Sequence, residues 1–136
     1  PSVITSEHRM TDSFGQIDEA IAMSAMYLAN HTKISGIASL TESGSTPLWM
    51  SRISSGIPIF ALSSHEKTLG RVTLYRGVFP TYFSREKMDK ADVNQYVIDK
   101  LRSRLLVNEG DSLIITKGDL IGNQGGTNSL KVVSVG

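Results

Sequence analysis

The feature of this sequence that most constrains its fold is the alternation of short apolar runs with helical patterns. Apolar runs bounded by Gly, Pro and polar residues predict strands, and apolar residues that recur every three or four positions predict helices. Each of the first four predicted strands is preceded by one predicted helix. The predicted strands cover residues 37–40, 58–62, 77–83, 113–115 and 130–133. The predicted helices cover residues 13–31, 46–54, 65–74 and 91–106.

This order predicts an α/β fold, a three-layer α/β/α sandwich around a mixed five-stranded sheet that is mostly parallel. Crossover helices join parallel strands and cover both faces of the sheet. The last two strands are joined by a Gly- and Asn-rich loop, residues 118–128, without a helix, so we expect the last strand to be antiparallel. Pro80 lacks the N–H that an inner strand needs, so we expect residues 77–83 at an edge of the sheet.

Three local motifs set the expected starts of helices. Two have the spacing of a capping box, in which a Ser side chain and a Glu or Gln three residues later satisfy free N–H groups. The third is an N-cap hydroxyl followed by Pro at the first helical position. The motifs are Ser13 with Gln16, Ser63 with Glu66, and Thr46 with Pro47.

The composition narrows the class of protein. A chain of 136 residues buries roughly two-thirds of its surface on folding, which is enough for a hydrophobic core. It has no Cys, only 12 Gly and 4 Pro, and a net charge of +1 with acids interleaved among the bases. These values exclude a disulfide scaffold, a disordered tail and a general nucleic-acid binder. No apolar run reaches the roughly 20 residues that span a bilayer, and the lack of Cys fits a reducing cytoplasm.

The organisation of the chain is simple. It begins at Pro1 rather than at Met, so we expect it to be a piece of a longer protein. Residues 1–12 are expected to form a linker from a preceding domain, and residues 13–136 to form one domain. No internal repeat divides that domain further.

Two loops at the predicted carboxyl edge of the sheet carry the candidate binding residues, because ligands of such sheets bind beyond the carboxyl ends of the strands. The first, residues 41–46 and called the cradle loop below, places four hydroxyls around one Gly directly before a helix. Free N–H groups and the helix dipole favour an anion such as phosphate there. The second, residues 118–128, supplies flexible backbone and amides to close over a small ligand. The candidates are Thr41, Ser43, Gly44, Ser45 and Thr46 in the cradle loop, and Gly122, Gln124, Gly125, Gly126 and Thr127 in the second loop.

A simpler interpretation of the cradle loop stays open. A turn of Ser, Thr and Gly before a helix is often only a helix cap. Glu42 also lies in this loop, and a carboxylate repels phosphate unless it points away or contacts a sugar hydroxyl. Its side chain could equally face solvent.

Catalytic and metal-binding motifs are absent from the sequence. There is no P-loop, no nucleophile elbow and no Cys cluster, and His8, His31 and His65 lack the spacing of metal ligands. We therefore assign no catalytic residue, no metal ligand and no cofactor to this chain. The mixed-charge run 84–90 is interpreted as a solvated loop.

Six segments together resemble the C-terminal, allosteric domain of pyruvate kinase. They occur in the order found in that domain and cover essentially the whole chain. The sequence is most similar to the bacterial enzymes that are activated by AMP and sugar phosphates. The segments are residues 21–25, 40–46, 51–53, 74–80, 110–111 and 126–128.

The resemblance implies the regulatory domain of a cytoplasmic, glycolytic kinase that transfers a phosphoryl group from phosphoenolpyruvate to ADP with Mg²⁺ and K⁺. In that family the catalytic groups lie in preceding domains, so we expect this segment to be inactive alone. The family's C-terminal domain binds a phosphorylated effector and forms one interface of a homotetramer, and no nucleic-acid or membrane partner is implied. Carried over by position, the effector's phosphate lies on the cradle loop, and residues Gly122 to Thr127 close the pocket.

Three departures from the family pattern bear on the effector. Glu42 and Ser45 stand where some fructose-bisphosphate-activated relatives carry a basic residue, and Val93 stands about where those enzymes place an arginine. A bisphosphate would lose two charge-assisted contacts of roughly 1.5–3 kcal/mol each. We therefore expect a monophosphate, either a hexose or pentose phosphate or AMP. The alternative is an assembly-only domain whose effector site is degenerate; a free-standing enzyme has no residues to support it.

Overall fold

The sheet has the predicted mixed topology. The computed structural model describes residues 6–53, 56–88, 90–118 and 127–136. The strands are β1 (Gly36–Leu40), β2 (Ile59–Ser63), β3 (Val78–Tyr82), β4 (Ser112–Lys117) and β5 (Ser129–Ser134). They form one sheet in the order β3-β2-β1-β4-β5. The first four strands are parallel to one another, and β5 is antiparallel to β4, as the missing crossover helix predicts. Pro80 lies in the edge strand β3, which confirms its predicted position.

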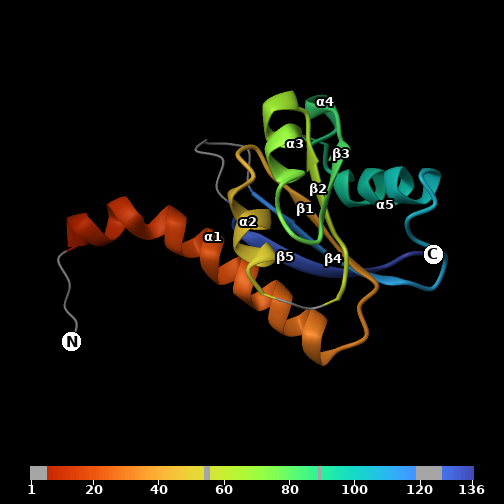
Figure 1. Cartoon of the computed structure of the whole chain (residues 1–136), viewed down its shortest axis with the longest axis horizontal. Helices are drawn as coiled ribbons and strands as arrows, with labels where there is room; N and C mark the ends of the chain where they lie inside the picture. Colours follow the sequence, from red (N-terminus) through yellow and green to blue (C-terminus); the bar gives the residue numbers. More distant parts are fainter. Residues whose placement is uncertain (1–5, 54–55, 89, 119–126) are drawn as a thin grey trace.

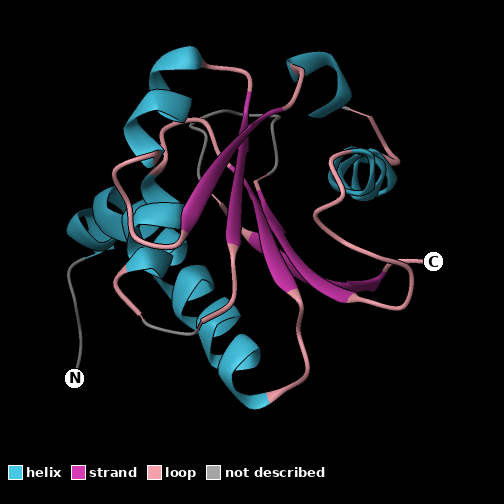
Figure 2. Ribbon diagram, turned by 45° about the vertical axis from the view of Figure 1, so that its right-hand side comes forward, coloured by secondary structure: helices cyan, strands magenta, loops and turns pink. Residues whose placement is uncertain are grey.

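Helices cover both faces of this sheet, which confirms the three-layer α/β/α fold (Figure 1). The helices are α1 (Ser6–His31), α2 (Ser45–Ser51), α3 (Glu66–Val72), α4 (Arg85–Met88) and α5 (Val93–Ser103). In Figure 2, α5 is seen nearly end-on across the sheet from α1, α2 and α3. Helix α4 is a short helix between β3 and α5.

Each face of the sheet has its own core, because alternate residues of a strand point to opposite faces. The core under α5 is built from large apolar side chains, among them Leu62, Leu101 and Leu113. The core under α1 contains three buried alanines of that helix, Ala22, Ala25 and Ala29. Small side chains allow the helix backbone to approach the sheet closely, and this brings α1 against α2 as well.

Local cap motifs predict the helix starts less well than the apolar runs predict the strands. Helix α1 begins at Ser6, so the predicted capping box of Ser13 lies inside the helix. Helix α2 has Gly44 as its N-cap, not Thr46. Helix α3 begins after His65 without a side-chain cap, and the Ser63 hydroxyl instead accepts a hydrogen bond from the His65 N–H.

The charged run after β3 also differs from its prediction as a loop. Residues Arg85–Met88 form the single turn α4. Helix α5 is shorter than predicted, from Val93 to Ser103, and its first residue is 3% exposed in the core under that helix.

Candidate functional site

The cradle loop is a tight turn between β1 and α2, held by its own hydroxyls. The Gly44 N–H donates to the Thr41 hydroxyl at 2.9 Å, and the Ser45 N–H donates to the Ser43 hydroxyl at 3.2 Å. Gly44 has φ 87°, and a Cβ there would lie 3.2 Å from Cγ1 of Val72. Both the backbone angle and the lack of space therefore require Gly at this position.

One buried hydrogen bond joins the two loops that the sequence singles out. The Thr46 hydroxyl donates to the Thr127 hydroxyl at 2.8 Å across 81 positions of sequence. The two side chains are 1% and 3% exposed. The structure thus brings Thr127 to the cradle loop. The other predicted residues of the second loop, Gly122, Gln124, Gly125 and Gly126, lie outside the described residues.

The accessible part of the cradle loop is smaller than its hydroxyl content suggests. Thr41 and Thr46 are buried and their hydroxyls already take part in hydrogen bonds. Ser43 is exposed and Ser45 is half-buried. The hydroxyls that an approaching ligand meets first are therefore those of Ser43 and Ser45.

Helix α1 contributes a carboxylate behind this turn. Asp18 accepts hydrogen bonds from the Thr127 N–H and from the Ser45 hydroxyl. Burial raises the pKa of Asp18, and these two hydrogen bonds oppose the rise. Asp18 is therefore an acceptor that ties α1 to both loops at once.

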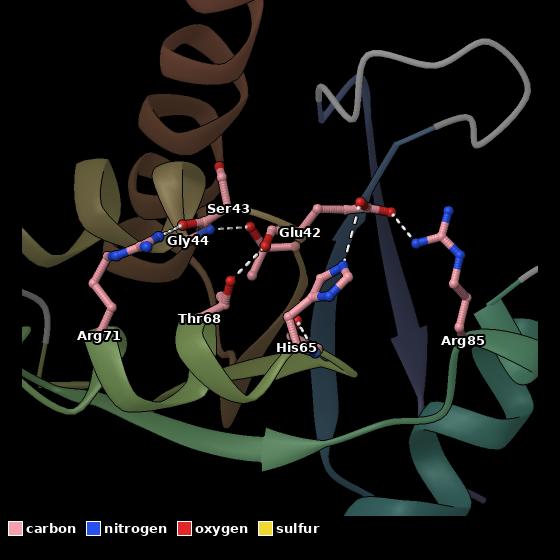
Figure 3. A network of polar contacts seen from close by, with 9 residues as sticks. Glu42, Ser43, Gly44, His65, Thr68, Arg71 and Arg85 are labelled. Carbon is pink, nitrogen blue, oxygen red and sulfur yellow. Dashed lines mark hydrogen bonds and ion pairs between the residues drawn. The ribbon is translucent and has the colours of Figure 1, made fainter.

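Helix α3 holds the backbone of the cradle loop from the opposite side. The Thr68 hydroxyl donates to the Glu42 carbonyl at 2.6 Å, and the Arg71 guanidinium donates to the Ser43 carbonyl at 2.6 Å (Figure 3). These contacts fix two successive peptide groups of the turn. They also place the positive charge of Arg71 beside Ser43.

The Glu42 side chain is held by two basic groups. Its carboxylate lies 3.0 Å from Nη1 of Arg85 and 3.5 Å from Nε2 of His65. Figure 3 shows the three side chains converging beside the cradle loop. Of the orientations considered for Glu42, the structure shows one in which its charge is balanced by Arg85.

Two further hydroxyls are buried at this end of the sheet. Ser39 of β1 and Thr116 of β4 are paired neighbours in the sheet, and both are fully buried. Neither hydroxyl oxygen has a hydrogen-bond partner among the residues that the structure describes. By strand alternation they share the face of Ile37 and Ile114, which is the face under α1.

Metal and membrane features are limited in the described part of the chain. Within residues 6–53, 56–88, 90–118 and 127–136, no three His, Cys, Asp or Glu side chains gather to hold a metal ion. No helix of the same ranges is both long and apolar enough to cross a membrane.

Comparison with known proteins identifies the family. A family model described as "Pyruvate kinase, alpha/beta domain" matches residues 19–133. This chain belongs to the pyruvate kinase family. A pyruvate kinase of Buchnera aphidicola subsp. Schizaphis graminum is 48% identical over 136 residues, which are 99% of this chain and 28% of that protein. Pyruvate kinase II of Salmonella typhimurium is 45% identical with the same coverage, and a pyruvate kinase of Staphylococcus saprophyticus is 32% identical over 117 residues.

The chain thus spans 28% of the length of the first of these curated pyruvate kinases. The bacterial relatives agree with the bacterial character of the resemblance. The matching family model is that of an α/β domain, which agrees with the α/β fold predicted from the sequence.

Five side chains of this pyruvate kinase domain reach the cradle loop although the sequence did not predict them there, those of Asp18, His65, Thr68, Arg71 and Arg85. Asp18 was detectable, because it continues the buried stripe of Ala22 and Ala25 at helical spacing. His65 and Arg85 follow the carboxyl ends of β2 and β3, where the rule for parallel sheets places ligand-binding residues. Thr68 and Arg71 lie inside α3 and carry no such signal.

Proposed function

We propose that this chain is the effector-binding and assembly domain of a pyruvate kinase. The full-length enzyme would transfer a phosphoryl group from phosphoenolpyruvate to ADP, in the cytoplasm, with Mg²⁺ and K⁺ held by its catalytic domains. The observation that carries the effector part is the buried Thr46–Thr127 hydrogen bond, which joins the two candidate loops at one edge of the sheet. The family and the share of length covered support the assignment to a non-catalytic segment.

The electrostatics of the cradle loop support an anionic ligand. Arg71 donates to the Ser43 carbonyl, so a guanidinium lies beside the backbone of the exposed Ser43. Glu42 is paired with Arg85, so its carboxylate is partly neutralised. A phosphate on Thr41, Ser43, Gly44, Ser45 and Thr46 would meet hydroxyls, backbone and one nearby cation, with the loop from Gly122 to Thr127 closing over the rest of the ligand.

The ligand we propose is a monophosphate, a hexose or pentose phosphate or AMP. Val93 is the buried first residue of α5, and its side chain offers neither charge nor hydrogen bond to a ligand. A second phosphate would therefore lack a partner at that position. Hydroxyl groups of a sugar or ribose would instead find polar partners at the cradle loop.

Effector binding would act by shifting a population of conformations. The cradle loop contacts α1 through Asp18 and α3 through Thr68 and Arg71. A ligand that tightens the turn would therefore move or stiffen helices on one face of the sheet. A coupling free energy of about 1–3 kcal/mol is enough for ordinary activation.

Assembly without an effector is the second candidate. It is favoured by the exposed apolar side chains on α1, where Met23 is 52% and Tyr27 64% exposed. It is also favoured by the internal hydrogen bonds that already satisfy Thr41 and Thr46. In this case the cradle loop would be only a cap, and α1 would pack against another copy in the homotetramer.

Effector titration of the full-length enzyme tests the proposal. Ribose 5-phosphate, glucose 6-phosphate, AMP and fructose bisphosphate would be titrated into the wild-type enzyme and into the Ser43→Ala/Thr46→Ala variant. This variant loses the exposed Ser43 hydroxyl and the Thr46–Thr127 bond that joins the two loops, and it is expected to raise the activation constant by at least about tenfold. Ser103→Ala is the matched control, because this exposed hydroxyl lies on α5 and bonds only within its own helix.

The two candidates differ in their expected outcomes. Activation that survives the double substitution would overturn the assigned site. Calorimetry that records no heat with any of the four phosphates, together with an intact tetramer on sizing, would favour assembly alone.

A further inference from the structure

Helix α1 holds both candidate loops through a single side chain. Asp18 accepts a hydrogen bond from the Thr127 N–H at 2.5 Å and another from the Ser45 hydroxyl. Ser45 belongs to the cradle loop, and Thr127 lies at the end of the second loop. The Asp18 side chain is half-buried and continues the helical stripe of Ala22 and Ala25. One carboxylate therefore fixes the position of α1 relative to both loops.

The Ser45 hydroxyl has only one proton to donate, and Asp18 accepts it. A doubly ionised phosphate group carries only acceptor oxygens, so it can bind this hydroxyl only by taking the same proton. The phosphate and the Asp18 carboxylate therefore compete for one donor. They also repel each other, because both are anions within hydrogen-bond distance of one oxygen.

Helix α3 contacts the same turn in a chemically different way. Thr68 and Arg71 donate to the carbonyl oxygens of Glu42 and Ser43. A phosphate cannot compete for a carbonyl oxygen, because that oxygen has no proton to donate. Binding therefore leaves the two contacts with α3 in place and exchanges the contact with α1.

We propose that Asp18 is the positioning residue that transmits effector binding to α1: the bound phosphate takes the Ser45 hydroxyl from Asp18 and frees the helix from the cradle loop. This proposal rests on the effector-binding function proposed above and names the side chain that carries its regulation. Without a ligand, the Asp18 contacts hold α1 in one position against both loops. With a ligand, the contact with Ser45 is lost, and repulsion from the phosphate weakens the contact with Thr127.

The freed helix carries this change to the surface of the domain. α1 is one continuous helix from Ser6 to His31 (Figure 1). The exposed side chains of Met23 and Tyr27 lie on it within about three turns of Asp18. A helix moves as a rigid unit over this distance, so a shift at Asp18 displaces both side chains. The effector site therefore acts on the exposed face of α1 and not on the core under α5.

Removal of the Asp18 charge should imitate the bound effector. An amide at position 18 repels a phosphate less than a carboxylate does, so the effector should bind more tightly. The amide also holds α1 less firmly, so less activation is left for the effector to produce. Binding and activation are reciprocally coupled, and the two measurements should therefore change in opposite senses. A purely structural role would weaken both together.

The test measures binding and activation separately in the full-length enzyme. The probes are ribose 5-phosphate, glucose 6-phosphate and AMP. Calorimetry gives the affinity, and the rate at sub-saturating phosphoenolpyruvate with and without each probe gives the activation ratio. For the activating probe, Asp18→Asn is expected to tighten binding by at least about threefold and to lower the activation ratio by at least about threefold.

Two control variants isolate the contact with α1. Glu19→Gln removes the same charge from the next residue of α1, and both measurements should stay at their wild-type values. Thr68→Val removes a contact of α3 with the cradle loop, and the activation ratio should be retained.

The remaining outcomes each reject the proposal for a different reason. A wild-type activation ratio in Asp18→Asn would show that the contact with α1 does not transmit binding. Weaker binding in Asp18→Asn, with a matching fall in activation and a lower melting temperature, would make Asp18 a structural support only. Loss of activation in Thr68→Val alone would assign the transmission to α3. If none of the three probes binds the wild-type enzyme, the effector-binding function itself is wrong, and the proposal falls with it.

Discussion

The two faces of the sheet use the same strands for different tasks. On β1, Leu40 points into the apolar core under α5, and its neighbour Ser39 points to the face under α1. The next strands repeat the contrast, with Leu62 beside Ser63 on β2 and Thr116 on β4. One face therefore holds large side chains up to its carboxyl edge, and the other changes from apolar to hydroxyl-bearing side chains there.

The difference teaches how a small domain keeps a polar site without losing its core. The α5 face carries most of the large apolar side chains, with Thr81 as a buried hydroxyl beside Leu62. The α1 face uses alanines, so its helix lies close enough for Asp18 to reach the cradle loop. Stability and site chemistry are thus separated by the alternation of residues along single strands.

The largest expected effect is a core truncation on the α5 face. Leu101→Ala should lower the free energy of unfolding by about 2–5 kcal/mol, because Leu101 is fully buried in that core. Urea unfolding measures the change. Leu105→Ala is the matched control: this side chain is 87% exposed, and the same truncation should cost less than about 0.5 kcal/mol. Equal losses at both positions would remove the contrast between core and surface.

A smaller effect is expected at the hydroxyls of the α1 face. Thr116→Val keeps the shape of the side chain and removes a buried hydroxyl that has no partner among the described residues. The free energy of unfolding should stay the same or rise by up to about 1 kcal/mol. Thr46→Val is the control, because it breaks the bond to Thr127 and should cost about 1–3 kcal/mol. A large loss in Thr116→Val would reveal a partner for that hydroxyl.

The smallest effect is a pH dependence that belongs to the α1 face alone. Because burial raises the pKa of Asp18 above its ordinary value near 3.8, the folded state binds a proton more readily than the unfolded state. Asp18 therefore lowers stability at neutral pH, and this loss is relieved as pH falls through its folded pKa. Wild type should gain stability relative to Asp18→Asn between neutral pH and about pH 4 in thermal unfolding. Parallel pH profiles of the two proteins would contradict this.

The strands and their directions were predictable because they rest on patterns that repeat along the chain. Apolar runs mark β1 to β5, and the presence or absence of a crossover helix sets their direction. Cap motifs were less reliable because they are short and local. Ser13 and Gln16 have capping-box spacing, yet they lie inside α1, where Ser costs only tenths of a kcal/mol.

The cradle loop was predictable as a turn, but its partners were not. Thr46 looks like an N-cap from its neighbours, whereas its hydroxyl in fact bonds Thr127 in a distant loop. Glu42 looks repulsive from sequence, and only the adjacency of β1, β2 and β3 reveals the pairing with His65 and Arg85. Contacts between strand ends depend on strand order, which local patterns do not contain. The binding roles of both loops remain predictions.

The length of α1 has a mechanical consequence. Its 26 residues extend about 39 Å, while a five-residue strand such as β1 extends only about 17 Å. The helix therefore projects beyond the sheet, as its red end does in Figure 1. Asp18 lies near its middle, so a tilt of about 10° around that point displaces the backbone of residue 6 by about 3 Å. A small tilt of this rigid helix at the cradle loop is thus amplified into a movement of atomic size at its far end.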